Sequence, residues 1–287
     1  MAKRMRLAVH GPQHQAESLD GLKISVIGAG KMGQALLKGL VACGVPPRLL
    51  TAAETDGAIR REVKRRFHCA VTAQVLDVAR DSDVILLAVK PQQVPEVVSA
   101  LAAHLPPRRP LVISIAAGIR LRWLEARLPG VPVVRVMPNL PATVGCGFTA
   151  VAPGRAASRR HQAVALALFQ AVGEAMVLPE RHFDAITAVS GSGPAYVFFL
   201  AQAWARAAAA LGLPAAVADQ AIRRTLEGSL RLWVASGESP ATLIANVASK
   251  KGTTEAALTV LAAHRVEAHF MEALRAAARR SKALAWS

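Results

Sequence analysis

The sequence predicts an α/β domain built on a parallel sheet, followed by an all-α domain. Short runs of β-branched residues alternate with helical patterns as far as about residue 180. One of these runs, residues 83–89, is almost continuously apolar, as expected for a parallel strand that is covered on both faces. Beyond about Asp184 the strand signals stop, and long stretches rich in alanine and leucine take over.

The strand runs fall at regular intervals, which sets the expected topology. We expect strands over residues 23–27, 49–53, 69–71, 83–89, 111–115 and 133–137. Strands that alternate with helices in this way form βαβ units, so the sheet should be parallel.

The second half of the chain predicts helices over residues 193–211, 214–235, from 240, 253–263 and 266–284. Pro194, Pro214 and Pro240 stand where three of them begin, and Gly212 stands near the end of another, which is the usual punctuation of helices. Helices so rich in alanine bury little area each and need close neighbours. A second copy of the chain in an intertwined dimer would supply them, and a self-contained bundle is the alternative.

Length and composition fit two domains. The chain has 287 residues, 53% of them hydrophobic. We expect a mobile extension over residues 1–20, a dinucleotide-binding domain over residues 21–180 and a helical dimerisation and substrate domain over residues 181–287.

The net charge of +16 raises the question of a nucleic-acid or membrane partner. The arginines are scattered, however, and no tract combines basic residues with aromatic ones. No apolar run reaches the length of a membrane span, and residues 1–20 lack the apolar core of a secretory signal. We therefore expect neither a specific nucleic-acid partner nor a membrane.

The three cysteines, Cys43, Cys69 and Cys146, are too widely spaced to indicate a disulfide framework or a metal site. We expect no metal ligand, and a reducing cytoplasm fits this pattern.

A glycine motif follows the first predicted strand and opens a helix. Gly28, Gly30 and Gly33 have the spacing G-x-G-x-x-G. In this motif the first glycine allows a tight turn, the second lets the backbone approach a pyrophosphate, and the third lets helix pack on strand. Glu54 follows the second strand, about 20 residues on, where an acid is expected to bind a ribose. The motif predicts a Rossmann-type dinucleotide-binding domain, and a glycine-rich turn without a ligand is the alternative.

In such a sheet the ligand meets the loops that follow the strand C-termini. These loops are residues 28–33, 53–54, 88–91, 116–118 and 137–141, and each is small or rich in glycine and proline.

Four segments then resemble, in the same order, those of the pyrroline-5-carboxylate reductase family. They are AVKP at residues 88–91, MPN at 137–139, SGSGPAY at 190–196 and VASKKGTT at 247–254. The resemblance runs from about Lys23 to Leu284. It implies a homodimer, with a larger ring of dimers as a further assembly, that uses NADP(H) or NAD(H) to reduce the C=N bond of Δ1-pyrroline-5-carboxylate to L-proline.

The resemblance also implies the site residues. The cofactor would be bound by Ile27, Gly28, Ala29, Gly30, Lys31, Met32, Gly33, Ala53, Glu54, Ala88, Val89, Lys90, Pro91, Ala116, Ala117, Gly118, Asn139 and Asn246. The small-molecule substrate would be bound by Glu180, Ser249, Gly252, Thr253 and Thr254. Thr254 is the catalytic candidate, as the group that hydrogen-bonds the ring nitrogen or orders a water there.

The residues themselves agree with a substrate site at Gly252, Thr253 and Thr254. They open a helix, whose free N–H groups suit the carboxylate of an imino acid. Helix capping by Ser249 or Thr253 is the alternative. Lys251 departs from the family, which usually has glycine there. A positive φ would be costly for a lysine, whereas its charge would attract a carboxylate.

The choice of cofactor rests on three residues. Glu54 favours the 2′-hydroxyl of NADH, whereas Arg60 and Arg61 lie where they could reach the 2′-phosphate of NADPH. We expect NADH to be tolerated.

Two other functions remain as alternatives. A related cyclic-imine or β-hydroxy-acid reductase would usually need a lysine on the helix after Gly193, and the sequence has none between Tyr196 and Leu211. A non-catalytic dinucleotide-binding protein would bind the cofactor without turnover.

Overall fold

The computed structural model describes residues 18–105 and 109–286, so the extension expected over residues 1–20 lies outside the described residues as far as residue 17. The chain divides into two compact units. One unit runs to Gly191 and is completed by the chain from Ala278 onward, and the other is Ser192–Ala277.

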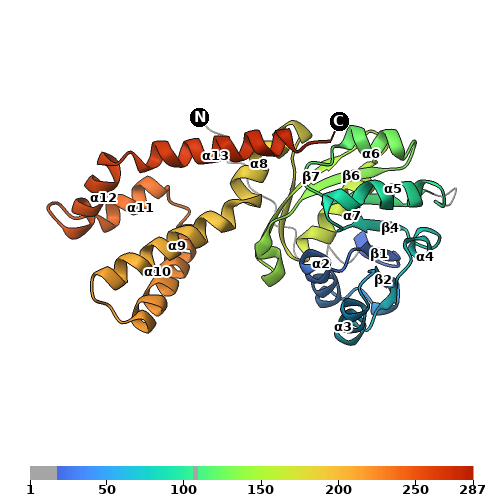
Figure 1. Cartoon of the computed structure of the whole chain (residues 1–287), viewed down its shortest axis with the longest axis horizontal. Coiled ribbons are helices and arrows are strands. Elements are labelled where there is room, and N and C mark those ends of the chain that lie inside the picture. Colours follow the sequence, from blue (N-terminus) through green and yellow to red (C-terminus); the bar gives the residue numbers. More distant parts are fainter. Residues whose placement is uncertain (1–17, 106–108, 287) are drawn as a thin grey trace. The chain divides into compact units, whose positions relative to one another are not determined.

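The first unit is built on an eight-stranded sheet with the order β3-β2-β1-β4-β5-β6-β7-β8 (Figure 1). The strands are β1 (Ile24–Ile27), β2 (Leu50–Ala53), β3 (Ala70–Thr72), β4 (Val84–Leu87), β5 (Leu111–Ser114), β6 (Val133–Met137), β7 (Gly147–Pro153) and β8 (Gly173–Val177). Every pair is parallel except β6 with β7. The first six strands have the order of a Rossmann-type sheet, which confirms the expected fold class.

Strands β7 and β8 extend this sheet beyond the six strands that the sequence predicts, and β7 is antiparallel to its neighbour β6. Glycines permit the close approach of β7 and β8, because a Cβ on Gly173 would lie 2.1 Å from the carbonyl oxygen of Gly147. Small residues at such positions weaken the apolar alternation by which a strand is recognised in a sequence.

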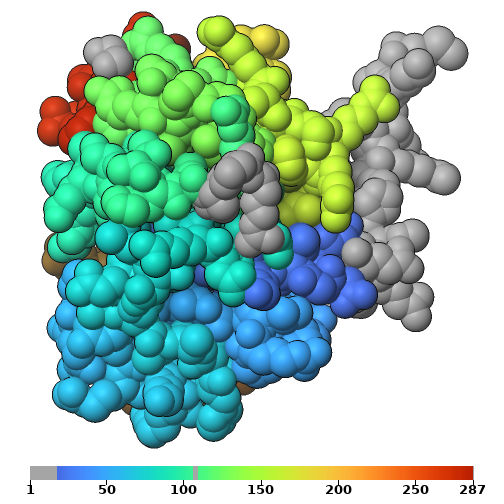
Figure 2. All heavy atoms as spheres, turned by 90° about the vertical axis from the view of Figure 1, so that its right-hand side faces the viewer, coloured from blue at the N-terminus to red at the C-terminus, as the bar shows by residue number. Residues whose placement is uncertain are grey.

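Helices cover both faces of the sheet. Helices α2 (Lys31–Ala42), α3 (Gly57–Phe67) and α7 (Arg159–Gln170) pack on one face, and α4 (Val75–Ala79), α5 (Val94–Ala102), α6 (Leu121–Arg127) and α8 (Phe183–Ile186) pack on the other. Within β4, Val84 and Leu86 belong to the first core, whereas Ile85 and Leu87 belong to the second. Burial on both faces explains why this strand has no polar alternation. In Figure 2 the segments coloured from blue to green lie against one another on the side of the first unit that faces the viewer.

Short turns complete the first unit. They are the 3₁₀ turns η1 (Pro47–Leu49), η2 (Pro91–Gln93), η3 (Leu140–Val144) and η4 (Glu180–His182), and the π-helical segment η5 (Thr187–Gly191).

The second unit is entirely helical. It contains α9 (Gly193–Ala210), α10 (Ala215–Ser236), α11 (Pro240–Val247), α12 (Thr253–Ala263) and most of α13 (Val266–Ala283), which ends in the first unit. These bounds agree with the sequence-based prediction to within a residue or two wherever it gave an end. In the described helices of this unit only Ala208, Ala218 and Ile222 are buried hydrophobic residues. Large apolar side chains are exposed instead, among them Phe198, Phe199, Trp204, Leu230, Leu232, Trp233 and Val234.

Within the described residues, no helix has the length and apolar character that a membrane crossing requires.

Candidate cofactor and substrate sites

Neighbouring strands of the sheet end together, at the point where the strand order reverses. The N–H of Gly28 donates to the carbonyl of Ala53 over 2.8 Å, and the N–H of Ala88 donates to the carbonyl of Ile27 over the same distance. The loops after β1, β2 and β4 are thereby held side by side. Open α/β sheets bind their ligands in this crevice.

The three glycines of the first loop have different surroundings. Gly28 has φ +95°, and a Cβ there would lie 2.8 Å from the backbone of Ala88. A Cβ on Gly33 would lie 2.2 Å from the carbonyl oxygen of Gly28. A Cβ on Gly30 would meet no atom within 4 Å, and this residue is the N-cap of α2 with no side-chain cap. Two glycines therefore serve packing, while the third leaves the helix N-terminus open.

Glu54 closes the other side of this loop. Its Oε2 accepts a hydrogen bond from the N–H of Ala29 over 2.9 Å, and its Oε1 accepts one from the N–H of Asp56 over 3.0 Å. Arg60 donates from Nη1 to the carbonyl oxygens of Glu54, at 2.6 Å, and Thr55, at 2.7 Å. The acid that the motif predicts therefore contacts the glycine loop directly, and the Arg60 guanidinium binds the backbone carbonyl of the same residue.

Positive charge gathers at the start of α3. A Cβ on Gly57 would lie 3.5 Å from Nη2 of Arg60 and 3.6 Å from Nη1 of Arg61, so both guanidinium groups lie beside this glycine. The pKa of the Asp56 carboxyl is lowered, first by hydrogen bonds from the helix backbone and then by these two arginines. At this end of the sheet a phosphate could therefore meet two arginines.

The loops after β4 and β5 are held by local contacts. Lys90 is exposed, and its N–H donates to Oε1 of Gln93 over 3.3 Å as the chain enters η2. Ala116 is buried and its N–H donates to Oγ of Ser114. Gly118 has φ +79°. Of the other predicted cofactor residues in these loops, Val89 and Pro91 flank Lys90, and Ala117 lies between Ala116 and Gly118.

Three further predicted cofactor residues lie in the glycine turn itself or beside it. Ala29 is fully buried, Met32 packs against the first core and Lys31 is exposed at the start of α2.

Asn139 has a structural task. Its Nδ2 donates to Oγ of Ser190 over 3.1 Å, and its Oδ1 accepts from the N–H of Phe148 over 2.9 Å. The amide therefore ties the end of β6 to the start of β7 and to the π-helical segment.

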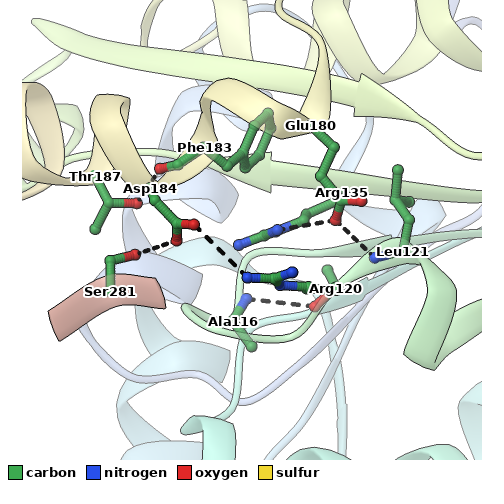
Figure 3. A network of polar contacts seen from close by, with 10 residues as sticks. Ala116, Arg120, Leu121, Arg135, Glu180, Phe183, Asp184, Thr187 and Ser281 are labelled. Atoms are coloured by element: carbon green, nitrogen blue, oxygen red, sulfur yellow. Dashed lines mark hydrogen bonds and ion pairs between the residues drawn. The ribbon is translucent and has the colours of Figure 1, made fainter. Parts of the chain in front are cut away.

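Glu180 is held by a buried arginine (Figure 3). Arg135 has a side chain only 4% exposed and donates from Nη1 to Oε1 of Glu180 over 2.8 Å. The same oxygen accepts from the N–H of Leu121 over 2.8 Å, and the guanidinium lies 4.7 Å from the ring centre of Phe183. Sequence reasoning missed Arg135, although an arginine inside the apolar strand VVRVM is itself a signal, because a buried charge needs a partner.

In the helical unit the predicted substrate residues come together at the start of α12. Gly252 is the N-cap and no side chain caps the helix. The N–H of Gly252 donates to the carbonyl of Ser249 over 3.0 Å, and a Cβ on Gly252 would lie 2.3 Å from Oγ of Ser249. Ser249, Gly252, Thr253 and Thr254 therefore share one helix N-terminus. Beside it is an open hollow of about 520 Å³ lined by Ala248, Ser249, Lys250, Glu255, Leu258, Thr259 and Ala262.

Lys251 does adopt the left-handed conformation, with φ +60°. This conformation costs a residue with a side chain about 1–2 kcal/mol, so the departure from glycine carries strain. The N–H of Lys251 donates to Oε2 of Glu255, which helps to hold the turn. Asn246, in α11 of the same unit, donates from Nδ2 to Oε2 of Glu238 over 3.4 Å.

Comparison with known proteins shows the family to which the chain is similar. Residues 180–284 match the model for pyrroline-5-carboxylate reductase dimerisation, and residues 23–118 match the model for NADP oxidoreductase, coenzyme F420-dependent. The pyrroline-5-carboxylate reductase of Synechocystis sp. is 39% identical over 264 residues, which cover 92% of this chain and 98% of the relative.

The chain belongs to the pyrroline-5-carboxylate reductase family. Among solved structures, the reductase of Coxiella burnetii is 31% identical with a TM-score of 0.88, and the match covers 93% of this chain and all of that one. The pyrroline carboxylate reductase of Plasmodium falciparum with NADP bound is 26% identical with a TM-score of 0.83, over 93% of this chain and 99% of that one. The family makes the chain an NAD(P)H-dependent oxidoreductase, and it makes the helical unit a dimerisation domain.

Proposed function

We propose that the chain reduces the C=N bond of Δ1-pyrroline-5-carboxylate with a hydride from NADPH or NADH and yields L-proline. The observation that carries this proposal is the start of α12. There Gly252 is the N-cap residue, no side chain caps the helix, and Thr253, Thr254 and Ser249 lie close by. The relatives that match the chain over nearly its full length are pyrroline-5-carboxylate reductases.

The first unit suits the cofactor. Residues 27–33 would hold the pyrophosphate, because Gly30 leaves the N-terminus of α2 open to an anion. Residues 53–54 would meet the adenosine ribose, and residues 88–91 and 116–118 the nicotinamide side. Asn139 in the first unit and Asn246 in the helical unit complete the proposed cofactor set. Apart from Asn246 and Glu180, the proposed cofactor residues lie within residues 21–180, and the proposed substrate residues lie within residues 181–287, which also serve dimerisation.

The start of α12 suits the substrate carboxylate. The N–H groups of Thr253 and Thr254 point out of the helix N-terminus, where the helix dipole favours a negative charge. The Lys251 ammonium adds positive charge close by. We also propose Glu180 as a substrate-side acid. The hydrogen bonds from Leu121 and Arg135 both go to its Oε1, so neither of them uses Oε2.

The chemistry needs little from an acid. When bound, the reduced nicotinamide supplies a hydride, whose electron pair forms the new C–H bond. The imine nitrogen is basic enough to be protonated beforehand, so the protein has to hold that N–H rather than create it. We assign this task to the Thr254 hydroxyl, directly or through a water. Most of the acceleration should come from holding the nicotinamide and the imine carbon in register, which can lower a barrier by about 7–11 kcal/mol.

The same contacts bear on cofactor choice. The Glu54 carboxylate faces the glycine loop, where it would accept from a ribose 2′-hydroxyl and repel a 2′-phosphate. Arg60 already donates to two carbonyl oxygens, which leaves Arg61 as the freer of the two arginines for a phosphate. We therefore infer that NADH is accepted. Glu54→Ser should raise the ratio of NADPH to NADH activity by about tenfold, the equivalent of about 1.4 kcal/mol.

Assembly and location complete the proposal. The helical unit would form a homodimer, and dimers would further assemble into a ring. A cytoplasmic location suits the three cysteines, all of which are described and free.

The test is the decay of absorbance at 340 nm with purified protein, Δ1-pyrroline-5-carboxylate, and NADPH or NADH in parallel. We expect decay that requires the imine, and the faster cofactor shows what Glu54 selects. Thr254→Val, which keeps the side-chain volume, should lower kcat about 10–100-fold with little change in cofactor binding. Cofactor binding without any turnover would replace the proposal with the non-catalytic alternative, and turnover of another imine or keto acid would replace the substrate.

A further inference from the structure

The last residues of α13, together with the residues that follow this helix, return to the loop that follows β5. We call residues 281–286 the C-terminal segment. The N–H of Trp286 donates to the carbonyl of Gly118 over 2.9 Å, and Trp286 forms a parallel bridge with Ile119. A Cβ on Gly118 would lie 2.7 Å from the carbonyl oxygen of Leu284. The loop and the segment are therefore in direct backbone contact, and glycine is required for it.

The indole of Trp286 strengthens this contact. It meets the ring of Trp123 edge to face, with centroids 6.0 Å apart and planes at 83°. Trp123 is only 4% exposed and lies in the first turn of α6, the helix that follows the loop. Arg127 lies over the same ring at 3.9 Å from its centre. Edge-to-face pairs of this kind contribute beyond the area that they bury.

A polar contact holds the other end of the segment (Figure 3). Ser281 donates from Oγ to Oδ1 of Asp184 over 2.8 Å, and Oδ2 of Asp184 lies 3.7 Å from Nη2 of Arg120. Arg120 is the N-cap residue of α6 and lies two residues after Gly118. The segment thus contacts the loop at Gly118 and is linked through Asp184 to the residue at which α6 begins.

The loop has few hydrogen bonds of its own: the N–H of Ala116 donates to Oγ of Ser114 over 3.3 Å, and the N–H of Ile119 donates to the carbonyl of Ala116 over 3.4 Å. Residues 116–118 are Ala-Ala-Gly, and Gly118 has the left-handed φ of +79°. The loop leaves β5 at the ligand edge of the sheet, because the N–H of Ile115 donates to the carbonyl of Leu87 at the end of β4. A short loop of small residues at this edge gains its fixed position from contacts made by other parts of the chain.

We propose that the C-terminal segment is a positioning element for the nicotinamide-side loop, with Trp286 as its positioning residue. The inference rests on the proposed function only in that residues 116–118 lie beside the nicotinamide. As a positioning residue, Trp286 acts through its contacts with Gly118 and Trp123. Without it the loop samples other positions, the cofactor binds less tightly, and the nicotinamide is held less well for hydride transfer.

The experiment compares three variants of the full chain with one control. Trp286→Ala removes the ring, Trp286→Phe keeps a ring that can pack edge to face, and Ser281→Ala removes the hydrogen bond to Asp184. Lys282→Ala is the matched control, because Lys282 is an exposed side chain in the same segment. Four quantities are measured: the dissociation constants of NADPH and NADH by nicotinamide fluorescence, kcat, the isotope effect with cofactor deuterated at C4, and the melting temperature.

We expect Trp286→Ala to raise the dissociation constant of the cofactor about threefold to tenfold, in line with the loss of one aromatic pair, and to enlarge the isotope effect. Ser281→Ala should give a smaller change in the same direction, whereas Trp286→Phe and Lys282→Ala should stay close to the original protein. The melting temperature should fall by no more than a few degrees in Trp286→Ala and return to the original value in Trp286→Phe.

Two results would overturn the inference. Unchanged cofactor binding and isotope effect in Trp286→Ala would mean that the loop holds its position without the segment. Parallel losses of activity and melting temperature, without restoration in Trp286→Phe, would mean that the segment serves stability alone. Failure of the proposed function looks different, because the original protein would then give no turnover, while the cofactor dissociation constants would still report on the loop.

Discussion

The two units differ in where their apolar side chains lie. The sheet unit encloses two cores, one on each face, and its fully buried residues include Leu36, Ile85, Leu86 and Phe169. The helical unit buries almost none of its apolar residues within one chain, and Phe199 is 72% exposed. Exposed apolar surface of this extent marks an interface. One unit therefore folds around its own residues, whereas the other needs a second copy to complete its core.

The largest effect should come from a charge on the exposed apolar surface of the helical unit. Phe199→Glu would bury a carboxylate in the dimer interface, at a cost of about 3 kcal/mol or more, and should weaken dimerisation at least about a hundredfold. Sedimentation across a dilution series measures this. Val144→Glu is the matched control, since Val144 belongs to the sheet unit and is also 72% exposed.

A dimer that survives Phe199→Glu, or one that is lost equally in Val144→Glu, would show that the apolar surface around Phe199 is not what completes the core of the helical unit.

The next largest effect should come from a cavity in the sheet unit. Leu86 in β4 is fully buried, so Leu86→Ala should cost about 2–5 kcal/mol of unfolding free energy. Hydrogen exchange followed by mass spectrometry resolves the two units. Faster exchange in the sheet unit should be the same at all protein concentrations, whereas exchange in the helical unit should slow as concentration rises. Concentration dependence in both units would show that the sheet unit also relies on the partner.

Much of this contrast was predictable from the sequence. β-branched runs located the first six strands, and prolines at 194, 214 and 240 marked the helix starts. Strands β7 and β8 were not predicted. Gly147 and Gly173 let the two strands approach closely, but glycines at these positions interrupt the apolar alternation by which a strand is recognised.

The site divides in the same way. Local spacing predicted the glycine loop, and the family resemblance predicted the residues around Gly252. The pairing of Glu180 with Arg135, and the contact of Trp286 with Gly118, join residues far apart in the sequence. The buried arginine in VVRVM indicates that a partner is needed, but no local pattern says which residue that partner is, because such contacts exist only once the sheet has formed.

A smaller effect is expected at the two glycine N-caps, Gly30 in the sheet unit and Gly252 in the helical unit. Gly30→Ala adds a methyl group in open space at φ −68°, so stability should change by less than about 1 kcal/mol. The methyl group would obstruct the pyrophosphate, and the cofactor dissociation constant should rise about tenfold or more. Gly252→Ala should instead displace Ser249 and raise KM for the imine.

Isothermal titration with cofactor, beside steady-state kinetics, separates the two glycine variants. If Gly30→Ala binds cofactor normally, the pyrophosphate does not approach this glycine. Gly28→Ala is the contrasting variant, since its φ of +95° and its contact with Ala88 should impair folding itself.

The smallest effect is a pH dependence confined to the sheet unit. Nδ1 of His161 accepts from the N–H of Ser158 over 3.1 Å in the capping box of α7. Burial, and then the charge of Arg160, lower the pKa of His161 below 6.5. The neutral His161 ring stabilises the folded state through this capping contact. Because the folded-state pKa is depressed, the stabilisation is complete above pH 6.5 and is lost as the pH falls through the lowered value.

The loss at His161 should stay below about 1 kcal/mol. Melting curves from pH 7.5 to 5 measure it, with His161→Gln as the variant that keeps an acceptor but does not titrate. An equally steep fall in the glutamine variant would assign the pH dependence to other groups. In the helical unit the ion pair of Asp219 and Arg223 lowers the pKa of the aspartate and raises that of the arginine. Both side chains are exposed, and the pair should contribute nothing to the change of stability between pH 7.5 and 5.

The chain enters the helical unit after Gly191 and leaves it again within α13, and this has a consequence for synthesis. On the ribosome the sheet strands emerge first and have all the residues that they need. The partners of Gly118, Trp123 and Asp184 emerge only after the whole helical unit has been made. A nascent or prematurely terminated chain would therefore carry a formed sheet with an unfinished loop after β5. Completion of that loop would coincide with the stage at which the helical unit becomes able to pair, so an incomplete chain would remain inactive until translation had passed both points.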